Sequence, residues 1–565
     1  MKRLSPDYDQ PWHGVHPIRR LLSWMQTERR DLWVALIYSI AVGILSLVVP
    51  IAIQALVNTI AFGMLLQPLV VLVVIVFVAL VLSGVLSVMR LYVVEVLQRR
   101  IFVRIGTDVV YRLLRVRIDG FDKGYGPELV NRFFEVVTVQ KAGATLIIDG
   151  LSLAIQMVVG LAILAAYDPL LLVFDLFLVV ALLIILFPLS SGALPTAVKE
   201  SKAKYAMAAW LEELARHPTT FKSAGGQTYA VDRADKLTAG YLKYRTQHFR
   251  VLLRQSVGAV GLQALGTSAL MAAGGFLVIE QRLTIGQLVA AELIVSGVLA
   301  AISKVGKQLE NFYDLLAAVD KLGYFTDLPL EKSGPEDLPR SDSGAELELK
   351  HVTFSHEDRA NNILEDVNWR IEAGSRIGLI AASGAGKSTA LDIIYGLRLP
   401  QSGVIEFDGR DTRDLQLEDL RGQIALVRQP EVFQGTITDN IRLGDKEMSL
   451  DQVRYALTMA GLLDDVQLLP NGIQTELVTN GLPLSHGQVI RLMLARAIAS
   501  RPRLLILDEI LDPIDDFTEC ARLVESLFDR SNPWTLIVVS QRADVLGRCD
   551  VRYTLKQGII ERAPQ

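Results

Sequence analysis

The stretch AASGAGKST, residues 381–389, is the part of this chain that decides the fold around it. Gly384 and Gly386 allow the backbone to turn tightly, so that several N–H groups point inward toward a phosphate. Lys387 supplies a positive charge for the outer phosphates, and Ser388 supplies a hydroxyl for Mg²⁺. These residue types in this order predict a loop that binds the phosphates of a nucleotide.

The segments around this loop provide the context that it requires. The apolar run 377–380 predicts a strand before it, and residues 389–397 predict a helix whose N-terminus faces the phosphates. Further on, LLILDE at 504–509 predicts a buried strand that ends in Asp508 and Glu509. One carboxylate can hold Mg²⁺ through water, and the next can orient a water on the γ-phosphate.

Length and composition predict a membrane protein of at least two domains. The chain has 565 residues, 51% of them hydrophobic, and its mean hydropathy is +0.34. Nearly all long apolar runs fall in 31–305, while Cys520 and Cys549 lie C-terminal to them and are expected to be free thiols. The net charge is −4, and we find no basic stripe with interleaved aromatic residues, so we expect no nucleic-acid partner.

Six segments are apolar and long enough to cross a bilayer core of roughly 30 Å as helices. They lie at 32–58, 68–94, 143–166, 169–190, 255–279 and 284–303. The first is too long for a cleaved signal, so it is interpreted as a retained span. The alternative is a helical protein with a buried core, which the basic residues between the segments disfavour.

Basic residues crowd the stretches between spans two and three and between spans four and five. They are Arg99, Arg100, Arg104, Arg112, Arg115, Arg117, Lys123, Arg132 and Lys141, and then Lys199, Lys202, Lys204, Arg216 and Lys222. Because cytoplasmic loops carry the excess of Lys and Arg, both long loops and both termini are predicted to be cytoplasmic. The chain is therefore expected to be a multi-pass protein of the cytoplasmic (inner) membrane.

Both long loops read as helices that continue past the membrane and break at Gly and Pro, at 117–132 and 211–226. Each tip is either a short helix that docks on the C-terminal domain or a solvated helical hairpin. The predicted organisation has four parts. They are an N-terminal segment 1–30, a six-span domain 31–325, a linker 326–344 rich in Pro, Gly and charge, and a nucleotide-binding domain 345–565.

A six-span domain followed by AASGAGKST, Gln429, LSHGQ (484–488) and LLILDE resembles the ABC exporter half-transporters. The resemblance implies an all-α six-helix transmembrane domain followed by an α/β P-loop NTPase domain. Residues 128–141, 170–179 and 282–297 are most similar to the type I secretion ATPases. Those proteins typically carry a further N-terminal peptidase or peptidase-like domain, and we expect a member without it.

The resemblance also implies a role for each matching residue. ATP and Mg²⁺ are the implied cofactors, with Glu509 and Gln541 catalytic and Ser388, Gln429 and Asp508 on the metal side. The implied ATP-binding residues are His356, Ala381, Ala382, Ser383, Gly384, Ala385, Gly386, Lys387, Ser388 and Thr389. The implied signature that acts in trans on a partner's nucleotide is Ser485, His486, Gly487 and Gln488, and Asp515 contacts the opposite chain. Coupling helices are implied near 118–126 and 214–224.

The implied partner is a second half-transporter, in a homodimer or a heterodimer that closes over ATP. The likeness to secretion ATPases favours a peptide or protein as the exported substrate, with a periplasmic adaptor protein as a possible partner. Lipids and amphipathic small molecules stay open as substrates, and membrane lipids surround the spans. The alternative function is a nucleotide-gated regulatory or channel-like membrane protein with little steady turnover.

Four residues depart from the family pattern. Ala381 replaces the first glycine of the phosphate loop, where a left-handed backbone would cost about 1–2 kcal/mol. His356 replaces an aromatic residue that stacks on adenine, and His486 adds a side chain where backbone approaches a phosphate. Gln541 replaces a histidine and cannot take up positive charge.

These departures predict partly degenerate ATP sites and slow turnover. Ala381 and Gln541 act in the site on this chain's own loop, whereas His486 acts in the partner's site. A regulatory, slowly hydrolysing site, a working variant and a site without ATPase activity all stay open. Glu509 is present, so we expect hydrolysis to occur.

Overall fold

The computed structural model describes residues 16–61, 66–122, 131–356, 362–382, 384–514 and 517–563. Ser383 and Asp515, both predicted site residues, lie outside these ranges. The chain divides into two compact units, which are described separately. The first comprises Met1–Val116 and Gly120–Pro329, and the second comprises Arg117–Asp119 and Leu330–Gln565.

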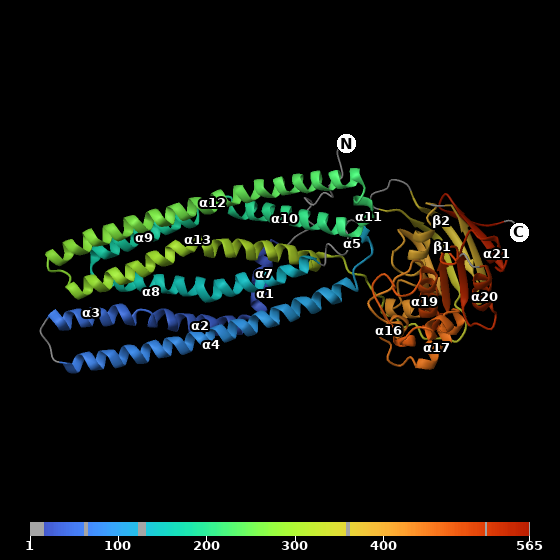
Figure 1. Ribbon diagram of the computed structural model, residues 1–565, viewed down its shortest axis with the longest axis horizontal. Coiled ribbons are helices and arrows are strands. Elements are labelled where there is room, and N and C mark those ends of the chain that lie inside the picture. Colours follow the sequence, from blue (N-terminus) through green and yellow to red (C-terminus); the bar gives the residue numbers. More distant parts are fainter. Residues whose placement is uncertain are drawn as a thin grey trace. The chain divides into compact units, whose positions relative to one another are not determined.

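The described residues of the first unit form helices joined by turns and short connections (Figure 1). Its helices are α1 (Pro17–Thr27), α2 (Arg29–Leu45), α3 (Val48–Ala61), α4 (Leu66–Leu113), α5 (Asp119–Asp122), α7 (Glu135–Thr145), α8 (Leu151–Tyr167), α9 (Pro169–Leu186), α10 (Ala193–Arg216), α11 (Pro218–Phe221), α12 (Ala224–Ile279) and α13 (Ile285–Asp327). Six described helical stretches are long and apolar enough to cross a membrane. The prediction of six spans is therefore confirmed.

Several of these helices are longer than a membrane requires. Helix α4 has 48 residues and α12 has 56 residues, so α4 alone extends about 70 Å. A bilayer core of about 30 Å accommodates less than half of either helix. The long loops are thus helical, as predicted; α11 lies at the second tip, and α5 lies at the first, where residues 123–130 fall outside the described part of the chain.

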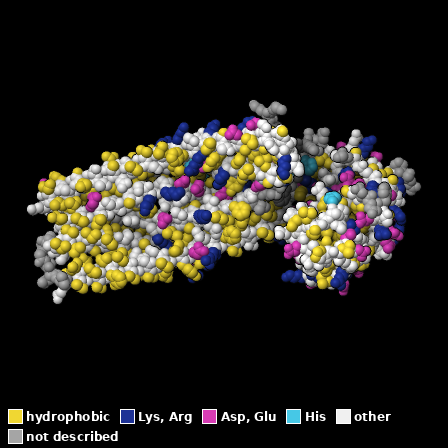
Figure 2. All heavy atoms as spheres, viewed as in Figure 1, with side chains coloured by type: hydrophobic (Ala, Val, Ile, Leu, Met, Phe, Trp, Pro, Cys, Tyr) yellow, Lys and Arg dark blue, Asp and Glu magenta, His cyan; other side chains and the backbone are white. Residues whose placement is uncertain are grey.

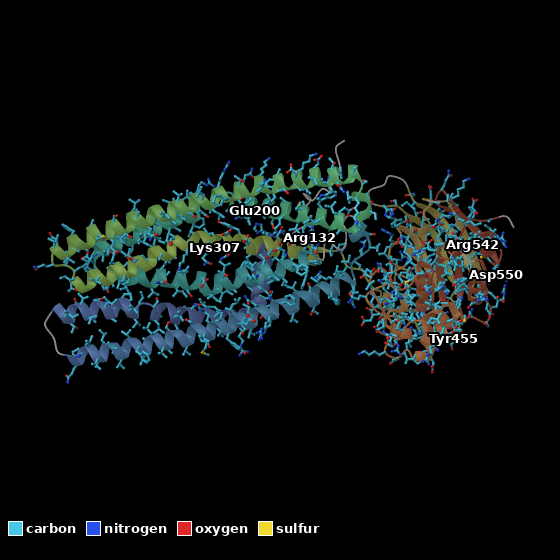
Figure 3. The ribbon with its side chains drawn as sticks, viewed as in Figure 1. Arg132, Glu200, Lys307, Tyr455, Arg542 and Asp550 are labelled. Atoms are coloured by element: carbon cyan, nitrogen blue, oxygen red, sulfur yellow. The ribbon has the colours of Figure 1, made fainter. Side chains whose placement is uncertain are left out.

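Charged side chains are unevenly distributed along the helical unit. In Figure 2 the end with the α12–α13 turn is covered mainly by hydrophobic side chains, and Lys, Arg, Asp and Glu gather further along. Arg132, Glu200 and Lys307 lie in this more charged part (Figure 3). The first basic residue of α13 is Lys304, about 30 Å along the helix from Ile285. The low-charge length therefore matches the thickness of a bilayer core.

Buried ion pairs join the helices at the charged end of this unit. Arg20 of α1 donates two hydrogen bonds to Asp327 of α13, at 2.8 and 2.9 Å. A Cβ at Gly323 would overlap the Arg20 guanidinium, so a larger residue there would displace this side chain from its present position. Lys321 contacts Glu135 at 2.9 Å in a second buried pair. Because breaking a buried pair leaves an uncompensated charge, these contacts specify how α1, α7 and α13 pack.

Two aspartates of the helical unit lie in opposite environments. Asp168 caps α9 by accepting a hydrogen bond from the Leu170 N–H at 2.8 Å, and it pairs with Arg282 at 2.7 Å. Asp175, within α9, is 5% exposed, and neither carboxylate oxygen has a hydrogen-bond partner. An ionisable side chain buried in a span without a partner is costly.

We expect the same chemical change at these two positions to have opposite effects on stability. Asp175→Asn removes an unpaired buried charge and should raise the thermal unfolding midpoint of the full chain in detergent. Asp168→Asn weakens the pair with Arg282 and should lower that midpoint, by the equivalent of about 1 kcal/mol. Fluorescence-monitored unfolding of both variants measures this. A midpoint for Asp175→Asn that falls as far as that of Asp168→Asn would contradict the assignment.

The second unit contains three sheets and a set of short helices. Its strands are β1 (Leu347–Phe354), β2 (Leu364–Ile371), β3 (Arg376–Ala381), β4 (Ser402–Phe407), β5 (Arg410–Asp411), β6 (Ile424–Val427), β7 (Gly435–Thr436), β8 (Glu476–Leu477), β9 (Leu504–Asp508), β10 (Thr535–Val539), β11 (Val551–Lys556) and β12 (Ile559–Arg562). The strand orders are β2-β1-β4-β5, β12-β11-β3-β10-β9-β6 and β7-β8.

The helices of this unit complete an α/β domain. They are α14 (Lys387–Ile394), α15 (Leu417–Gln423), α16 (Ile437–Arg442), α17 (Leu450–Met459), α18 (Leu463–Gln467), α19 (His486–Ala499), α20 (Phe517–Phe528) and α21 (Ala543–Leu546). All five residues of β9 and all five of β10 are buried. Such continuous apolar runs are typical of parallel strands that are covered on both faces.

The segment that leads into the second unit is bonded to that unit. Glu331 forms a bidentate pair with Arg421, with distances of 2.7 and 2.8 Å. The Glu336 N–H donates to the Asp414 carbonyl at 2.9 Å. This part of the predicted linker is therefore attached to the second unit.

Candidate functional site

Four parallel strands place their C-terminal ends side by side at one edge of the six-stranded sheet. In spatial order they are β3, β10, β9 and β6, and each neighbouring pair is parallel. The residues that follow these strands therefore meet, although they are far apart in the sequence. In open parallel sheets this edge is where ligands bind.

The loop after β3 has the conformation expected of a phosphate loop. Gly384 and Gly386 have φ of +79° and +101°, a region that side-chain-bearing residues rarely adopt. A Cβ at Gly386 would lie 2.8 Å from Cγ2 of Ile363, so this position also needs glycine for space. Within the loop, the Ala385 N–H donates to the Ala382 carbonyl at 3.2 Å.

The expected cost of alanine at position 381 is wrong. Ala381 is the last residue of β3, is paired in register with Leu555 of β11, and does not have a positive φ. An extended residue in a strand accommodates a Cβ without strain, so the left-handed penalty does not arise. The two positions that need glycine, 384 and 386, retain it.

Lys387 and Glu509 form an ion pair at the centre of the edge. Lys387 begins α14, is 9% exposed, and its ammonium contacts the Glu509 carboxylate and the Ala381 carbonyl, the latter at 3.4 Å. Glu509 has φ of +54°, and its N–H donates to the Val539 carbonyl of β10 at 3.0 Å. A left-handed non-glycine residue held by a neighbouring strand is typical of functional sites.

Asp508 is paired with a residue that the sequence interpretation did not single out. Nε of Arg428 donates to Oδ2 of Asp508 at 2.7 Å, and a terminal nitrogen of Arg428 donates to the Ser388 carbonyl at 3.1 Å. Burial raises the pKa of Asp508, and the Arg428 guanidinium beside it offsets part of that rise.

A second carboxylate completes this cluster of charges. Asp392 of α14 is 7% exposed and accepts from Arg428 at 2.8 Å on one oxygen and from Arg398 at 3.1 Å on the other. Burial alone would lower the pKa of Arg428, but its hydrogen bonds to Asp392 and Asp508 raise that pKa above its usual value. Asp392, Asp508 and Glu509 thus each pair with at least one cation of the cluster.

Gln541 is the second residue after β10, and its side chain is exposed. Its N–H donates to Oδ2 of Asp512 at 3.2 Å, and the Ser540 hydroxyl donates to the other oxygen of Asp512. The next residue, Arg542 (Figure 3), donates to the Ile514 carbonyl at 2.8 Å. The backbone at Gln541 is therefore held in place, while its amide group points into solvent.

Ser388 and Gln429 lie at the same edge. Ser388 is the second residue of α14, and Gln429 follows Arg428 after β6. Both are exposed, and neither side chain has a hydrogen bond to another residue within the described ranges. Thr389, by contrast, is 9% exposed.

The segment LSHGQ begins helix α19. The Gln488 N–H donates to the Ser485 hydroxyl at 3.3 Å, and the Ser485 N–H donates to the Gln488 side chain at 2.9 Å, a reciprocal capping box. His486 is the first residue of the helix and is exposed, and Gly487 has open space around its Cβ position. His486 is therefore compatible with the local backbone, and its imidazole lies at the positive end of a 14-residue helix.

His356 follows β1 and is half-buried. Its ring packs edge-on against Phe354, with centroids 5.2 Å apart. This contact fixes one side of the imidazole against an aromatic neighbour.

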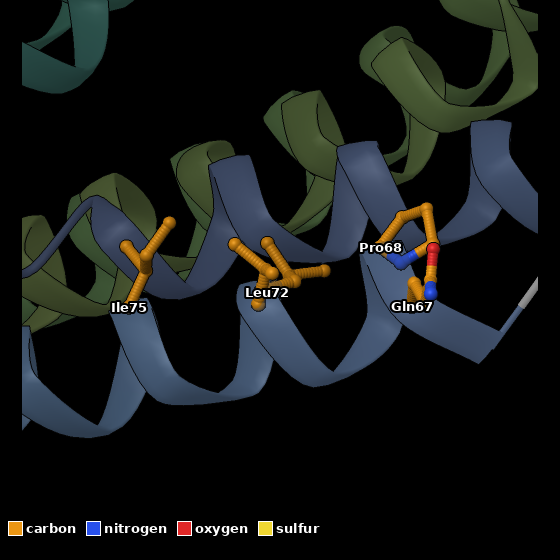
Figure 4. Close-up of a pocket in the computed structure, with 5 residues that line it drawn as sticks. Gln67, Pro68, Leu72 and Ile75 are labelled. Atoms are coloured by element: carbon orange, nitrogen blue, oxygen red, sulfur yellow. The ribbon is translucent and has the colours of Figure 1, made fainter.

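The pocket in Figure 4 does not belong to this site. It is lined by Gln67, Pro68, Val71, Leu72 and Ile75, all in the first turns of α4. It contains no titratable side chain, so it offers no group for acid–base or metal chemistry.

Three residues of this edge escaped the sequence interpretation, namely Arg428, Asp392 and Asp512. The sequence did contain a signal for Arg428, because it is a cation that directly follows a short apolar run and directly precedes the predicted site residue Gln429. Its target could not be inferred, since that depends on β6 lying next to β9. Asp392 and Asp512 read as ordinary surface acids until the fold brings basic or polar partners to them.

Comparison with known proteins agrees with this geometry. Residues 32–302 match the ABC transporter transmembrane region and residues 364–512 match the ABC transporter family. The chain is 30% identical over 357 residues to the alpha-hemolysin translocation ATP-binding protein HlyB of Escherichia coli O157:H7, covering 62% of this chain and 50% of that protein. It is 29% identical over 334 residues to the leukotoxin translocation ATP-binding protein LktB of Mannheimia haemolytica, covering 58% and 46%.

The chain spans about half the length of these relatives. Among solved structures, a bacterial Atm1-family ABC exporter with ATP bound superposes with a TM-score of 0.82 at 21% identity, covering 95% of both chains. At that identity the likeness shows the fold. The transmembrane region and the ABC domain are joined in one polypeptide, and this chain belongs to the ABC transporter family.

Proposed function

We propose that this chain is one half of an ABC exporter that couples ATP binding and hydrolysis to export of a peptide, protein or amphipathic substrate. The observation that carries the proposal is the convergence of Lys387, Asp508, Glu509, Gln429 and Gln541 on one sheet edge. The toxin-translocation names of its relatives support a peptide or protein substrate.

ATP would lie with its phosphates in the loop after β3, at the positive N-terminus of α14. His356 would stack on the base, and the N–H groups of residues 382–389 would surround the phosphates. The main-chain turn is already formed by Gly384 and Gly386. These two described glycines therefore already have the conformation that a turn around phosphate requires.

The residues at this edge fit Mg²⁺, which prefers oxygen ligands and keeps several waters. The Ser388 hydroxyl and the Gln429 amide are exposed and lack partners among the described residues, and Asp508 is the adjacent carboxylate. When bound, the ion would neutralise phosphate charge. Ser388, Gln429 and Asp508 would hold it, and Glu509 would accept the proton of the attacking water.

Nucleotide would change the charge balance of the site. Lys387 now contacts Glu509, and a phosphate oxygen is a stronger partner for that ammonium. Transfer of Lys387 to the phosphates would free the Glu509 carboxylate to act as a base. Gln541 would donate a hydrogen bond to the γ-phosphate without adding charge, which supports slow turnover.

The exporter would work as a dimer, with a second copy or a related half-transporter. Ser485, His486, Gly487 and Gln488 would face the partner's nucleotide from the N-terminus of α19, and Asp515 would contact the partner chain. The basic long loops support a cytoplasmic location for both termini in the inner membrane. A periplasmic adaptor would be a further partner, and lipids would surround the six spans.

A nucleotide-gated regulatory or channel-like protein is the second candidate. The specific observation in its favour is Gln541, which stands where the family has a histidine. Such a protein would close over ATP but would not accumulate substrate in a hydrolysis-dependent manner.

Replacing the proposed base should separate these functions. We expect Glu509→Gln to lower ATPase activity of the purified full chain by about 100-fold or more, because a neutral amide cannot accept the proton. ATP-dependent uptake of the substrate into inside-out vesicles should be lost with it. Glu525→Gln, an exposed change on α20, is the matched control and should leave both unchanged. Uptake or ATPase activity that survives Glu509→Gln would contradict the proposed coupling.

Gln541, two residues after β10, should limit the rate of ATP hydrolysis. We expect Gln541→His to raise ATPase activity by about tenfold, because imidazole can carry positive charge to the γ-phosphate. Steady-state hydrolysis of the full chain measures this. Gln557→His, on the β11–β12 turn, serves as the control and should leave the rate unaltered. If Gln541→His folds and gives no gain, the residue at position 541 does not limit the rate.

A further inference from the structure

The strongest unassigned feature of the nucleotide-binding unit is Arg428. Its guanidinium donates to Asp508 at 2.7 Å, to Asp392 at 2.8 Å and to the Ser388 carbonyl at 3.1 Å. These three partners come from β9 and from the first two turns of α14. The side chain is 26% exposed, so its charge lies partly away from water.

Two of the three partners of Arg428 belong to residues proposed to hold the metal ion, through the Asp508 carboxylate and the Ser388 backbone carbonyl. Ser388 and Asp508 are the residues expected to hold Mg²⁺, and Arg428 contacts both of them. A guanidinium supplies hydrogen-bond donors and a full positive charge and cannot be deprotonated in a protein. It therefore meets the same electrostatic need at Asp508 that a divalent cation would meet.

We propose that Arg428 competes with Mg²⁺ for Asp508, so that this chain binds nucleotide with an unusually weak dependence on divalent cation. The inference rests on the proposed function, because it takes Asp508 to be the metal-side carboxylate. With Arg428 in place, the charge of Asp508 is balanced before any ion arrives. An ion at Asp508 would lie beside the positive charge of Arg428, which holds Oδ2 at 2.7 Å, and the two cations would repel each other.

Arg428 has a second charged partner that would hold it when it leaves Asp508. Arg428 is anchored at its other end by Asp392, which also holds Arg398 at 3.1 Å. A guanidinium that leaves Asp508 therefore keeps a charged partner on α14. The side chain can move off the metal position without leaving an unpaired buried cation.

Removing the charge should change Mg²⁺ dependence in both directions. The experiment measures the affinity of the full chain in detergent for the hydrolysis-resistant analogue adenosine 5′-(β,γ-imido)triphosphate across a Mg²⁺ titration. In Arg428→Gln, the Mg²⁺ concentration for half-maximal binding should fall about tenfold, equivalent to about 1.4 kcal/mol. In EDTA the same variant should bind the analogue more weakly than wild type, since Asp508 then lacks a counter-charge.

Two further variants distinguish competition from a merely structural role. Arg428→Lys keeps the charge and should retain a wild-type Mg²⁺ midpoint. Arg454→Gln removes an exposed arginine of α17 that pairs with Asp451 at 3.7 Å, and it should also match wild type. A simple loss of fold would weaken binding with and without Mg²⁺, rather than move the two in opposite directions.

The outcomes separate this inference from the proposed function. An Mg²⁺ midpoint in Arg428→Gln equal to that of wild type would overturn the inference, even if vesicle uptake shows that the chain exports. Weaker binding of the analogue by Arg428→Gln at every Mg²⁺ concentration would overturn it as well. A shifted Mg²⁺ midpoint in a chain that fails to accumulate substrate would support Arg428 as the competing cation. The same result would contradict the proposed export function.

Discussion

The charge balance at the C-terminal edge of the parallel sheet is the constraint on which the site depends. Asp508 ends the buried strand β9, and Glu509 follows it. Glu509 pairs with Lys387, and Asp508 pairs with Arg428, which follows the neighbouring strand β6. Asp508 is 5% exposed, and a buried carboxylate without such a partner would disfavour the fold. Because the phosphates of a nucleotide need the same lysine, binding must rearrange these pairs. Occupancy of the loop and the availability of a base are thus linked by electrostatics.

In the helical unit, two buried ion pairs lie outside the low-charge part of the helices, which matches the thickness of a bilayer core. Arg20 with Asp327, and Lys321 with Glu135, join helices beyond the stretch that matches a bilayer core. Asp175 of α9 differs from these paired residues, because it is buried and its carboxylate has no hydrogen-bond partner. Long rigid helices joined by buried pairs would transmit movement over tens of ångströms, which an exporter requires.

Much of this arrangement could be predicted from the sequence, because its signals are local. Six long apolar runs predict six spans, and AASGAGKST between an apolar strand and a helix predicts the phosphate loop. The pairing of Arg428 with Asp508 could not be predicted, since it joins residues 80 positions apart through the adjacency of β6 and β9. The sequence also could not show that Ala381 is tolerated. That conclusion depends on the extended backbone of Ala381 in β3, which avoids the cost of a left-handed conformation.

The central claim is that nucleotide takes Lys387 from Glu509. The most direct measurement is a pair of cryo-electron microscopy structures of the full chain, one without nucleotide and one with Mg²⁺ and a hydrolysis-resistant ATP analogue. We predict that Lys387 contacts Glu509 in the first, and that in the second its ammonium lies on phosphate oxygens with Glu509 released. Phosphates bound in the loop while Lys387 still contacts Glu509 would contradict the account.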